Sequence, residues 1–342
     1  MAAVLVRRAE RSSGLRPLDP SRDLRGVAKL IEEAFAYDLD RTGRSALREL
    51  QAWSRLGPVL WWLEKIGGDF SDLLSGFVWE EAGQIVGNIT VNRIAPGSQR
   101  WLISNVAVAR SHRGRGIARV LMDAALGYVE ECQGDVVSLQ VRADNAPARH
   151  IYHSLGFKDV SGLTYLRLDR VPPVAWLPLP PGLIARPHRY NKKDSRRAYE
   201  LARAARSAKA QEHRPLRQRQ FQLGLEDHID GFFRRLVGGG PSRHTVVENE
   251  DGSLVATLSV KPGTWRREHH LNLVVHPEYW GRLEHPLISQ GLIYLGNWPQ
   301  RAIAFEHPAE HVAGVDAFKS FGFNEIWTHV WMKLDLQRPD AG

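Results

Sequence analysis

The sequence of 342 residues contains almost no cysteine and no long apolar run. Its one cysteine, Cys132, excludes an internal disulfide framework and a cysteine-rich metal site. No stretch is long and apolar enough to cross a bilayer as a helix, and Met1–Ser13 has no apolar signal core. We therefore expect a cytoplasmic protein without a membrane partner.

A glycine-rich turn in the first half lacks the residues of the common nucleotide loops. It has no Lys-Ser/Thr pair and no G-x-G-x-x-G spacing, which excludes a triphosphate loop and a dinucleotide fingerprint. Because glycine has no Cβ, an anion can closely approach the N–H groups at the start of a following helix. The pattern predicts a pyrophosphate cradle, with an ordinary tight turn as the alternative. The turn consists of Arg113, Gly114, Arg115, Gly116, Ile117 and Ala118.

A strand and a capped helix follow further along the chain. Alternation and β-branching predict a strand over Val137–Val141. Asn145 is placed to cap the next helix, with Pro147 in its first turn and Gly156 just past its end. Tyr152 stands two helical turns after Asn145, so the two residues share a helix face.

With these two motifs, R-G-x-G-x-A and N-x-x-A-x-x-x-Y-x-x-L-G-F, the chain resembles the GCN5-related N-acetyltransferases from Leu15 to Leu168. The resemblance implies an α/β fold, with a mixed, mostly antiparallel sheet flanked by helices, and acetyl-CoA as cosubstrate. It implies that the loop amides hold the pyrophosphate, that Arg113 and Arg115 assist electrostatically, and that Asn145 contacts the cofactor arm. The strand backbone that would pair with the pantetheine arm belongs to Val106, Ala107 and Val108.

The resemblance also assigns the reacting groups. Tyr152 becomes the acid that protonates the departing thiolate, whereas a core tyrosine is the alternative. Many relatives carry a glutamate as general base where this chain has Ser104, so the base is left unassigned. Four glutamates are candidates, each expected to be a surface carboxylate. They are Glu32, Glu33, Glu80 and Glu81.

The second half repeats the plan of the first. Five prolines within residues 172–182 predict an extended connector, and hairpin patterns occur on both sides of it, over 77–91 and 245–260. Asn105-Val106-Ala107-Val108 corresponds to Asn272-Leu273-Val274-Val275 further on. The chain is therefore expected to hold two tandem domains of the same α/β fold.

The second copy has lost the residues of the predicted site. Trp280-Gly281-Arg282-Leu283 replaces the R-G-R-G turn, and Leu283 is expected to put its side chain into the phosphate space. Phe318 replaces the tyrosine, and His311 falls where Asn145 did. We expect a degenerate domain with a structural or substrate-shaping role.

These patterns give five predicted segments. Residues 1–14 form a disordered lead-in, 15–170 the catalytic domain, 171–182 a proline-rich linker, 183–337 the degenerate domain and 338–342 a tail. Helices over 24–35 and 47–66 would cover the acceptor site, and the second brings the apolar acceptor candidates Trp53, Trp61 and Trp62.

The net charge of +8 suits an anionic cofactor. From Arg186 to Arg219, twelve Lys and Arg face three Asp and Glu, which indicates either a solvated helix face or a basic surface for an acidic partner. Nucleic acid is not expected, because no aromatic platform accompanies these charges. Metal binding is not expected either, since the spacing of the histidines matches no zinc signature.

The predicted reaction is direct acetyl transfer from acetyl-CoA to an acceptor, expected to be a primary amine of a small molecule, a protein N-terminus or a lysine. Catalysis is assigned to the first domain. The alternative function is a non-catalytic module that senses acyl-CoA or binds a protein. The sequence does not predict the oligomeric state.

Overall fold

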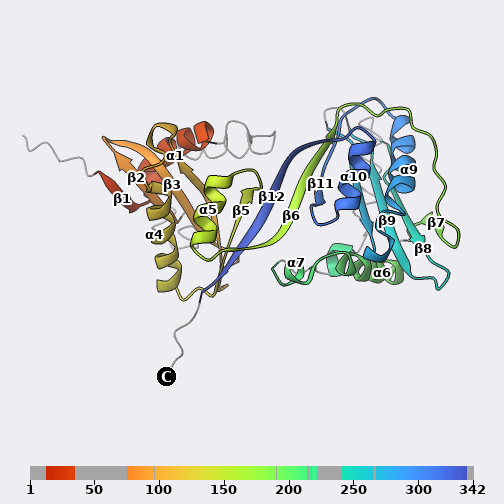
Figure 1. Cartoon of the computed structure of the whole chain (residues 1–342), viewed down its shortest axis with the longest axis horizontal. Helices are drawn as coiled ribbons and strands as arrows, with labels where there is room; N and C mark the ends of the chain where they lie inside the picture. The colour runs from red at the N-terminus through yellow and green to blue at the C-terminus, as the bar shows by residue number, and fades with distance from the viewer. Residues whose placement is uncertain are drawn as a thin grey trace, which may run out of the picture. The chain divides into compact units, whose positions relative to one another are not determined.

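The computed structural model describes residues 13–34, 75–95, 97–189, 191–213, 216, 218–221, 240–264 and 267–336. The chain forms two compact units (Figure 1). The first unit comprises Met1–Gln140, His150–Lys158 and Met332–Gly342, and the second comprises Val141–Arg149 and Asp159–Trp331. Each unit thus includes a segment from the other half of the sequence. The five segment boundaries expected from the sequence stay a prediction.

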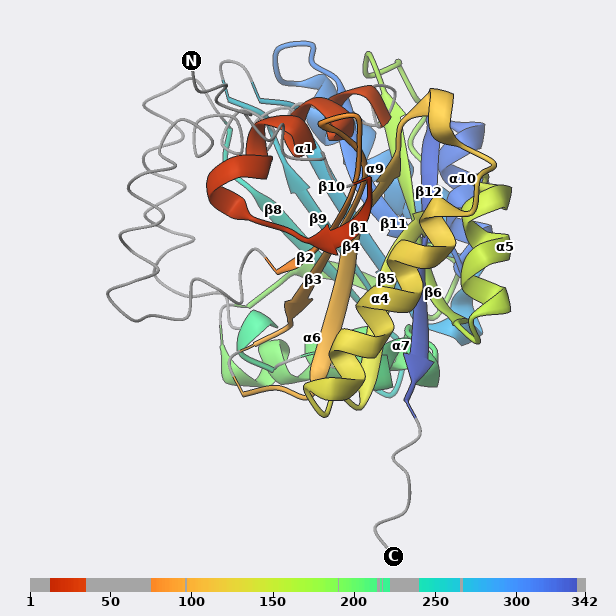
Figure 2. The same cartoon turned by 90° about the vertical axis from the view of Figure 1, so that its left-hand side faces the viewer.

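The first unit is built on strands in the order β1-β2-β3-β4-β5, with the end of β12 next to β5. Figure 2 shows α4 lying along these strands. In this part of the chain the elements are β1 (Gly14–Pro17), α1 (Pro20–Ala34), β2 (Gly76–Glu81), β3 (Gln84–Arg93), β4 (Arg100–Val108), α4 (Ile117–Glu131), β5 (Val136–Arg142) and α5 (Ala146–Ser154).

The hairpin of β2 and β3 forms where alternation predicted it. Its turn residues Ala82 and Gly83 have φ angles of 52° and 78°. Two positive φ angles in a two-residue loop match the right-handed twist of the flanking strands. β3 is buried continuously from Val86 to Val91, as in a sheet covered on both faces, and both α1 and α4 pack against it.

The second unit contains an antiparallel sheet in the order β10-β9-β8-β7 and the antiparallel pair of β6 and β11. Thr164 on β6 and Thr328 on β12 share a hydrogen bond of 2.9 Å. The elements are β6 (Lys158–Leu168), β7 (Ile184–Pro187), α6 (Lys192–Ala204), α7 (Ala208–His213), β8 (Arg243–Glu248), β9 (Leu254–Lys261), β10 (His270–Val275), α9 (Glu284–Gly296), β11 (Ile303–Pro308), α10 (Val312–Ser320) and β12 (Asn324–Asp335).

The proline-rich segment 171–182 forms no helix or strand and ends in a turn at Pro181 and Gly182, and it packs on α9 in the second unit. The hydroxyl of Ser289 donates to the carbonyl of Ala175 at 3.1 Å and accepts from the N–H of Leu177 at 3.2 Å. One buried serine thus satisfies two backbone groups of a segment that has no ladder of its own.

Each unit has the same partly buried ionic group, which joins the strand that opens each copy of the repeat to the helix that follows it. In the first unit, Arg16 on β1 binds Asp23 on α1 at 2.6 Å and Glu80 on β2 at 2.8 Å. The second unit repeats this arrangement, with both distances at 2.7 Å. Its members are Arg186 on β7, Asp194 on α6 and Glu248 on β8. The repeat therefore extends to a polar group that the motifs did not reveal.

Part of the basic segment from Arg186 to Arg219 is occupied by internal ion pairs. Arg186 belongs to the buried group, Arg197 binds Glu248 at 2.8 Å, and Arg196 binds Glu200 at 2.9 Å one helical turn away. Three of the twelve basic residues of this segment therefore form ion pairs within the protein.

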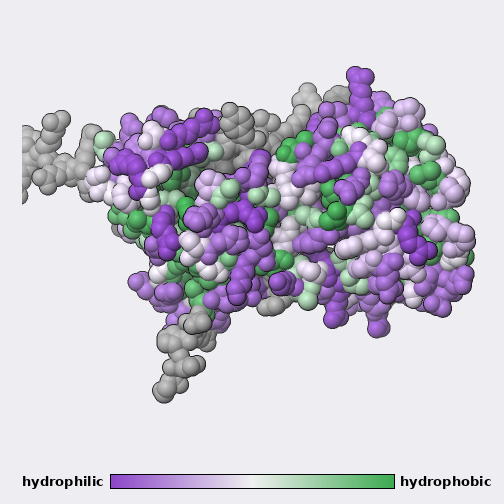
Figure 3. All heavy atoms as spheres, viewed as in Figure 1, coloured by the Kyte–Doolittle hydropathy of each residue, from purple (hydrophilic) through white to green (hydrophobic). Residues whose placement is uncertain are grey.

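Hydrophilic residues predominate on the visible face of each unit (Figure 3). Large apolar side chains such as Trp101 and Phe157 are buried, whereas Trp176 is exposed. Among the described residues, no helix is both long and apolar enough to cross a membrane. Residues 47–66, including Trp53, Trp61 and Trp62, lie outside the described part of the chain, as do most of the predicted lead-in and the tail.

Candidate functional site

The site begins where β4 and β5 separate. The two strands pair in parallel only over Arg100–Ile103 and Val136–Leu139. Val108 and Ala107 keep partners on β3, namely Gly87 and Asn88. Among the described residues no strand pairs with the other edge of β4 beyond Ile103. A strand edge without a neighbouring strand offers backbone N–H and C=O groups to which an extended ligand can add as a further strand.

A β-bulge bends β4 at this point. The register with β3 shifts between Asn88 and Thr90, and Asn105 has a φ of 53°. The side-chain amide of Asn88 donates to the carbonyl of Asn105 at 3.0 Å, which holds the bulge from the neighbouring strand. Asparagine tolerates this left-handed backbone better than most residues. Sequence analysis missed the bulge, although a lone asparagine in an apolar strand was a usable signal.

The glycine-rich turn joins this edge to α4. A 3₁₀ turn over Arg110–His112 leads to Gly114 and Gly116, with φ angles of 76° and 78°. A Cβ at either glycine would meet no atom within 4 Å, so the space beside the turn is open. The buried side chain of Ile117 anchors the helix start. The N–H groups of Ile117 and Ala118 have no acceptor within the helix, as at every helix N-terminus.

Cationic side chains surround the turn. The Nε of Arg113 donates to the carbonyl of Val108 at 3.2 Å, and the guanidinium of Arg115 lies 3.1 Å from a carboxylate oxygen of Glu81. Arg119, in the first turn of α4, donates to the hydroxyl of Ser154 at 2.9 Å. This contact joins the start of α4 to the end of α5, the helix that carries the candidate acid.

Tyr152 is buried on α5, with its ring centroid 6.1 Å from that of Phe157. Burial raises the pKa of its phenol to about 12, so the hydroxyl keeps its proton throughout the neutral range. Asn145 is exposed and caps α5 as predicted, since its Oδ1 accepts from the N–H of Ala148 at 3.2 Å. The contact of Asn145 with a cofactor arm stays a prediction.

One of the four candidate bases is not where the sequence placed it. Glu80 was expected at the surface but is only 3% exposed, because Arg16 and Arg22 each bind its carboxylate at 2.8 Å. Both oxygens are occupied, which makes Glu80 unsuitable as a base. Glu81 binds Arg115, and Glu33 accepts from the backbone N–H of Arg110 at 3.3 Å.

The chain matches known acetyltransferases over this region. The model of the acetyltransferase (GNAT) family matches residues 30–157. Streptothricin acetyltransferase from Streptomyces lavendulae is 34% identical over 143 residues, which cover 39% of this chain and 74% of that protein. The chain belongs to the GNAT family. It is therefore an N-acetyltransferase by class, and acetyl-CoA is the cosubstrate that this family generally uses.

Other relatives match a smaller part of their own length. Mycothiol acetyltransferase from Tsukamurella paurometabola is 34% identical over 104 residues, and the chain spans only 36% of that protein. Two solved structures share the fold over nearly the whole chain. A GCN5-related N-acetyltransferase from Sphaerobacter thermophilus has a TM-score of 0.57 at 15% identity, covering 95% of this chain and 96% of that one. A tandem GNAT protein from the clavulanic acid biosynthesis pathway has a TM-score of 0.50 at 18% identity, covering 96% and 100%.

The second unit of this GNAT protein repeats the turn up to its last residue. A 3₁₀ turn over Pro277–Tyr279 leads to Gly281, whose φ of 78° matches that of Gly114. Leu283 then has a φ of −107°, where Gly116 has 78°. The side chain of Leu283 is fully buried in the core, so the expectation that it fills the phosphate space was wrong. A leucine avoids positive φ, and the changed backbone turns its side chain inward.

A carboxylate of the protein itself lies at the start of α9. Glu284 is fully buried, and its Oε2 accepts from the N–H of Leu283 at 3.1 Å. Its other oxygen lies 2.7 Å from Nε2 of His311, whose Nδ1 lies 3.0 Å from Nε2 of His307. Burial lowers the pKa of His307 to about 3. Phe318, which replaces the tyrosine, packs among Phe305 and Phe323 in the core and has no proton to give.

Proposed function

We propose that the first unit transfers an acetyl group from acetyl-CoA directly to a primary amine, with catalysis by this unit alone. The observation that carries the proposal is that the open strand edge, the glycine-rich turn and the helix of Tyr152 lie next to one another in the first unit. The open edge at Val106–Val108 leads directly into the turn over Arg113–Gly116, and the Arg119–Ser154 contact brings the helix of Tyr152 against the start of α4.

Each part of this site has a separate task. The β4 edge offers backbone groups to the amides of the pantetheine arm. The N–H groups from Arg113 to Ala118 and the helix dipole attract the pyrophosphate, and the open space beside Gly114 and Gly116 admits it. The guanidinium groups of Arg113 and Arg115 add positive charge, which attracts the phosphates more strongly than backbone N–H groups alone.

The pKa of Tyr152 defines what it can do for the leaving group. A phenol of pKa about 12 is a weaker acid than a free thiol of pKa ~8.5. It therefore does not transfer its proton to the sulfur before the C–S bond breaks. It can donate a hydrogen bond that strengthens as negative charge develops on sulfur, because the buried site excludes competing water. The thiolate is thereby stabilised only as it forms.

The acceptor is proposed to be an amine of a small molecule, a protein N-terminus or a lysine. Attack on the acetyl carbon requires an unprotonated amine, and the hydroxyl of Ser104 cannot take up that proton at neutral pH. The relative that acts on streptothricin supports a small-molecule amine as the first choice for screening.

The test measures release of free thiol from acetyl-CoA with a panel of small amines, peptides with free N-termini and lysine peptides. Tyr152→Phe is expected to lower kcat by roughly 100-fold or more, with acetyl-CoA affinity changed less than about threefold. Tyr128→Phe, which alters another tyrosine packed in the same unit, is the matched control and should leave turnover unchanged.

Two results would contradict the proposal in different ways. Equal turnover by Tyr152→Phe and the unaltered protein removes Tyr152 from the chemistry. Tight acetyl-CoA binding without turnover on any acceptor indicates a non-catalytic module that senses acyl-CoA.

A further inference from the structure

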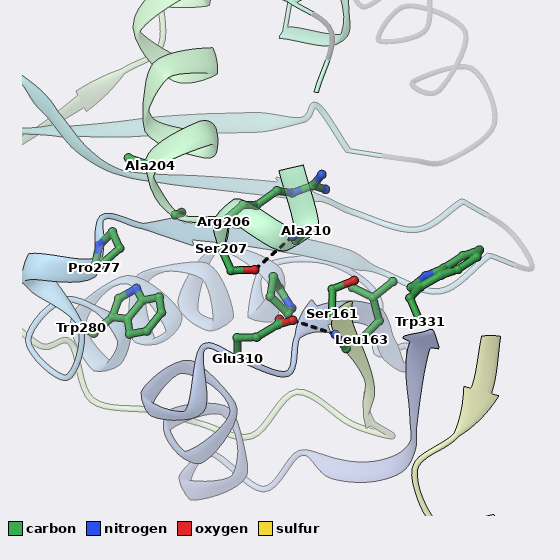
Figure 4. A pocket seen from close by; sticks show the side chains of 13 residues that line it. Ser161, Leu163, Ala204, Arg206, Ser207, Ala210, Pro277, Trp280, Glu310 and Trp331 are labelled. Carbon is green, nitrogen blue, oxygen red and sulfur yellow. Dashed lines mark hydrogen bonds between the residues drawn. The ribbon is translucent and has the colours of Figure 1, made fainter. Parts of the chain in front are cut away.

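The second unit contains a cavity of about 230 Å³ beside the turn that replaces the cradle (Figure 4). Its lining comes from β6, the α6–α7 corner, the turn before α9, the end of β11 and β12. Apolar side chains form most of the wall, with two indoles, two prolines and several alanines. The side chains that the argument uses are Trp280, Trp331, Glu310 and Arg206.

The repeat shows how the chemistry of this position has changed. In the first unit the turn residues Arg110, His112 and Arg113 are basic, which suits an anion. The equivalent residues of the second unit are Pro277, Tyr279 and Trp280, although the 3₁₀ turn and its glycine are retained. At the helix start, Glu284 stands where the first unit has Ile117. Two aromatic residues and a proline have thus replaced three basic residues, and an acidic residue has replaced an apolar one, whereas Arg282 stands where the first unit has Arg115.

The indole of Trp280, which lines the cavity, is fixed in position by contacts with other residues of the second unit. Its Nε1 donates to the carbonyl of Val275 at 3.0 Å, and its ring stacks on His311 at 4.6 Å with an interplanar angle of 20°. His311 in turn binds the buried carboxylate of Glu284 at 2.7 Å. A buried pair of this kind carries a large desolvation cost. Here it fixes the position of the indole that faces the cavity.

Glu310 supplies the charge of the cavity. It follows β11, and one of its oxygens accepts from the N–H of Gly162 at 2.8 Å, which orients the carboxylate. Figure 4 shows Glu310 between Trp280 and Trp331, with Arg206 on the other side of the lining. The carboxylate of Glu310, which is exposed, attracts an organic cation through Coulombic interaction, and the indole of Trp280 in the same lining adds a cation–π interaction.

We propose that this cavity binds a small organic ammonium ion with an apolar or ring-shaped body. The ammonium group lies against Glu310, and the body lies against the indole of Trp280 and the apolar side chains of the lining. Cavities for drug-sized ligands measure roughly 300–1,000 Å³, so this one admits a single ring or a short chain. The positive charge of Arg206, between α6 and α7, disfavours a ligand that carries a second positive charge on that side of the cavity. The site is separate from the acetyl-CoA site proposed in the first unit, and its test measures binding and not turnover.

The test uses three probes with the same ring and different charge: benzylammonium, benzyl alcohol and benzoate. Calorimetric titration of the full chain should show benzylammonium binding at least tenfold more tightly than benzyl alcohol, and no binding of benzoate. Glu310→Gln keeps an acceptor for the Gly162 N–H but loses the charge, so its affinity for benzylammonium should fall to the level of benzyl alcohol. Glu306→Gln, an exposed glutamate on β11 outside the lining, is the matched control and should bind as the unaltered protein does.

Equal affinity for benzylammonium and benzyl alcohol overturns the proposal, because charge then has no part in binding. Tighter binding of benzoate overturns it too and makes Arg206 the dominant group. The charge series on the unaltered protein decides the matter even if Glu310→Gln fails to fold.

Discussion

The backbone angle of one residue separates the two turns of this protein. Gly116 and Leu283 occupy equivalent positions, and their φ angles are 78° and −107°. At Gly116 the left-handed backbone leaves open space beside the helix start. At Leu283 the chain turns a side chain into the core, and the carboxylate of Glu284 meets the helix N–H instead. The loss of one glycine therefore accounts for the different backbone of the two turns at the helix start.

Gly116→Ala tests this argument by adding a single methyl group. A Cβ at Gly116 meets no atom within 4 Å, so the expected effect comes from the backbone. The left-handed conformation costs an alanine about 1–2 kcal/mol, and relief of that strain alters the cradle. Titration should show acetyl-CoA affinity lowered by roughly tenfold or more.

Gly127→Ala is the matched control for this variant. Gly127 lies within α4, and a Cβ there also meets no atom within 4 Å. Alanine favours the helix by roughly 0.5–1 kcal/mol, so the control should unfold at a higher temperature and bind acetyl-CoA as before. Unchanged affinity in Gly116→Ala would show that the turn does not depend on its left-handed glycine.

At the scale of elements, the local patterns were predictable and the long-range ones were not. The β2–β3 hairpin, α4 and the cap of α5 were predicted because alternation, turn residues and caps lie close together in sequence. The divergence of β4 from β5 and the bulge at Asn105 depend on neighbouring strands, so no local pattern reports them. The burial of Glu80 likewise depends on Arg16, which lies far away in sequence.

The buried ionic groups are the element-scale feature that sequence analysis missed most completely. Arg16-Pro17 and Arg186-Pro187 are the same dipeptide at the end of β1 and of β7. That coincidence was visible in the sequence. Its meaning was not, because the partners Asp23 and Asp194 lie on helices whose approach to the strands only the fold defines.

The group in the second unit predicts a specific acid sensitivity. Burial alone would raise the pKa of Asp194, but the Arg186 guanidinium and the N–H of Arg189 offset this and lower it to about 2. The folded carboxyl thus binds a proton more weakly than the unfolded one, whose pKa is 3.8. Its contribution of about 2 kcal/mol is present above pH ~4 and is lost as the pH falls towards 2.

Urea unfolding across this pH range checks the prediction. The free energy of unfolding of Asp194→Asn should be lower by about 3 kcal/mol at pH 7, because Arg186 then loses a buried partner. The difference from the unaltered protein should shrink as the pH falls from 4 to 2. Asp251→Asn, in the exposed turn between β8 and β9, is the control and should show no such convergence. A constant difference at all pH values would contradict the assignment.

For the molecule as a whole, two copies of one fold carry different chemistry. The first unit keeps a basic, open turn next to an unpaired strand edge. The second unit keeps the turn and the divergence of its strands, since in the described part of the chain β10 and β11 are joined only by the bridge between His269, just before β10, and Ile303. It fills the remaining positions with aromatic and acidic groups. The duplicated backbone therefore does not imply a duplicated ligand.

This reasoning predicts one acetyl-CoA site for each full chain. The matched variants are Arg115→Ala and Arg282→Ala, which remove the equivalent arginine from the first and the second turn. Arg115→Ala should weaken binding by roughly tenfold, the effect of losing about 1.4 kcal/mol from a charged contact with phosphate. Arg282→Ala should leave both affinity and stoichiometry unchanged, because Glu284 already occupies the helix start beside it. Calorimetric titration measures both quantities at once. Two sites per chain, or equal effects of the two variants, would show that the second turn still binds the cosubstrate.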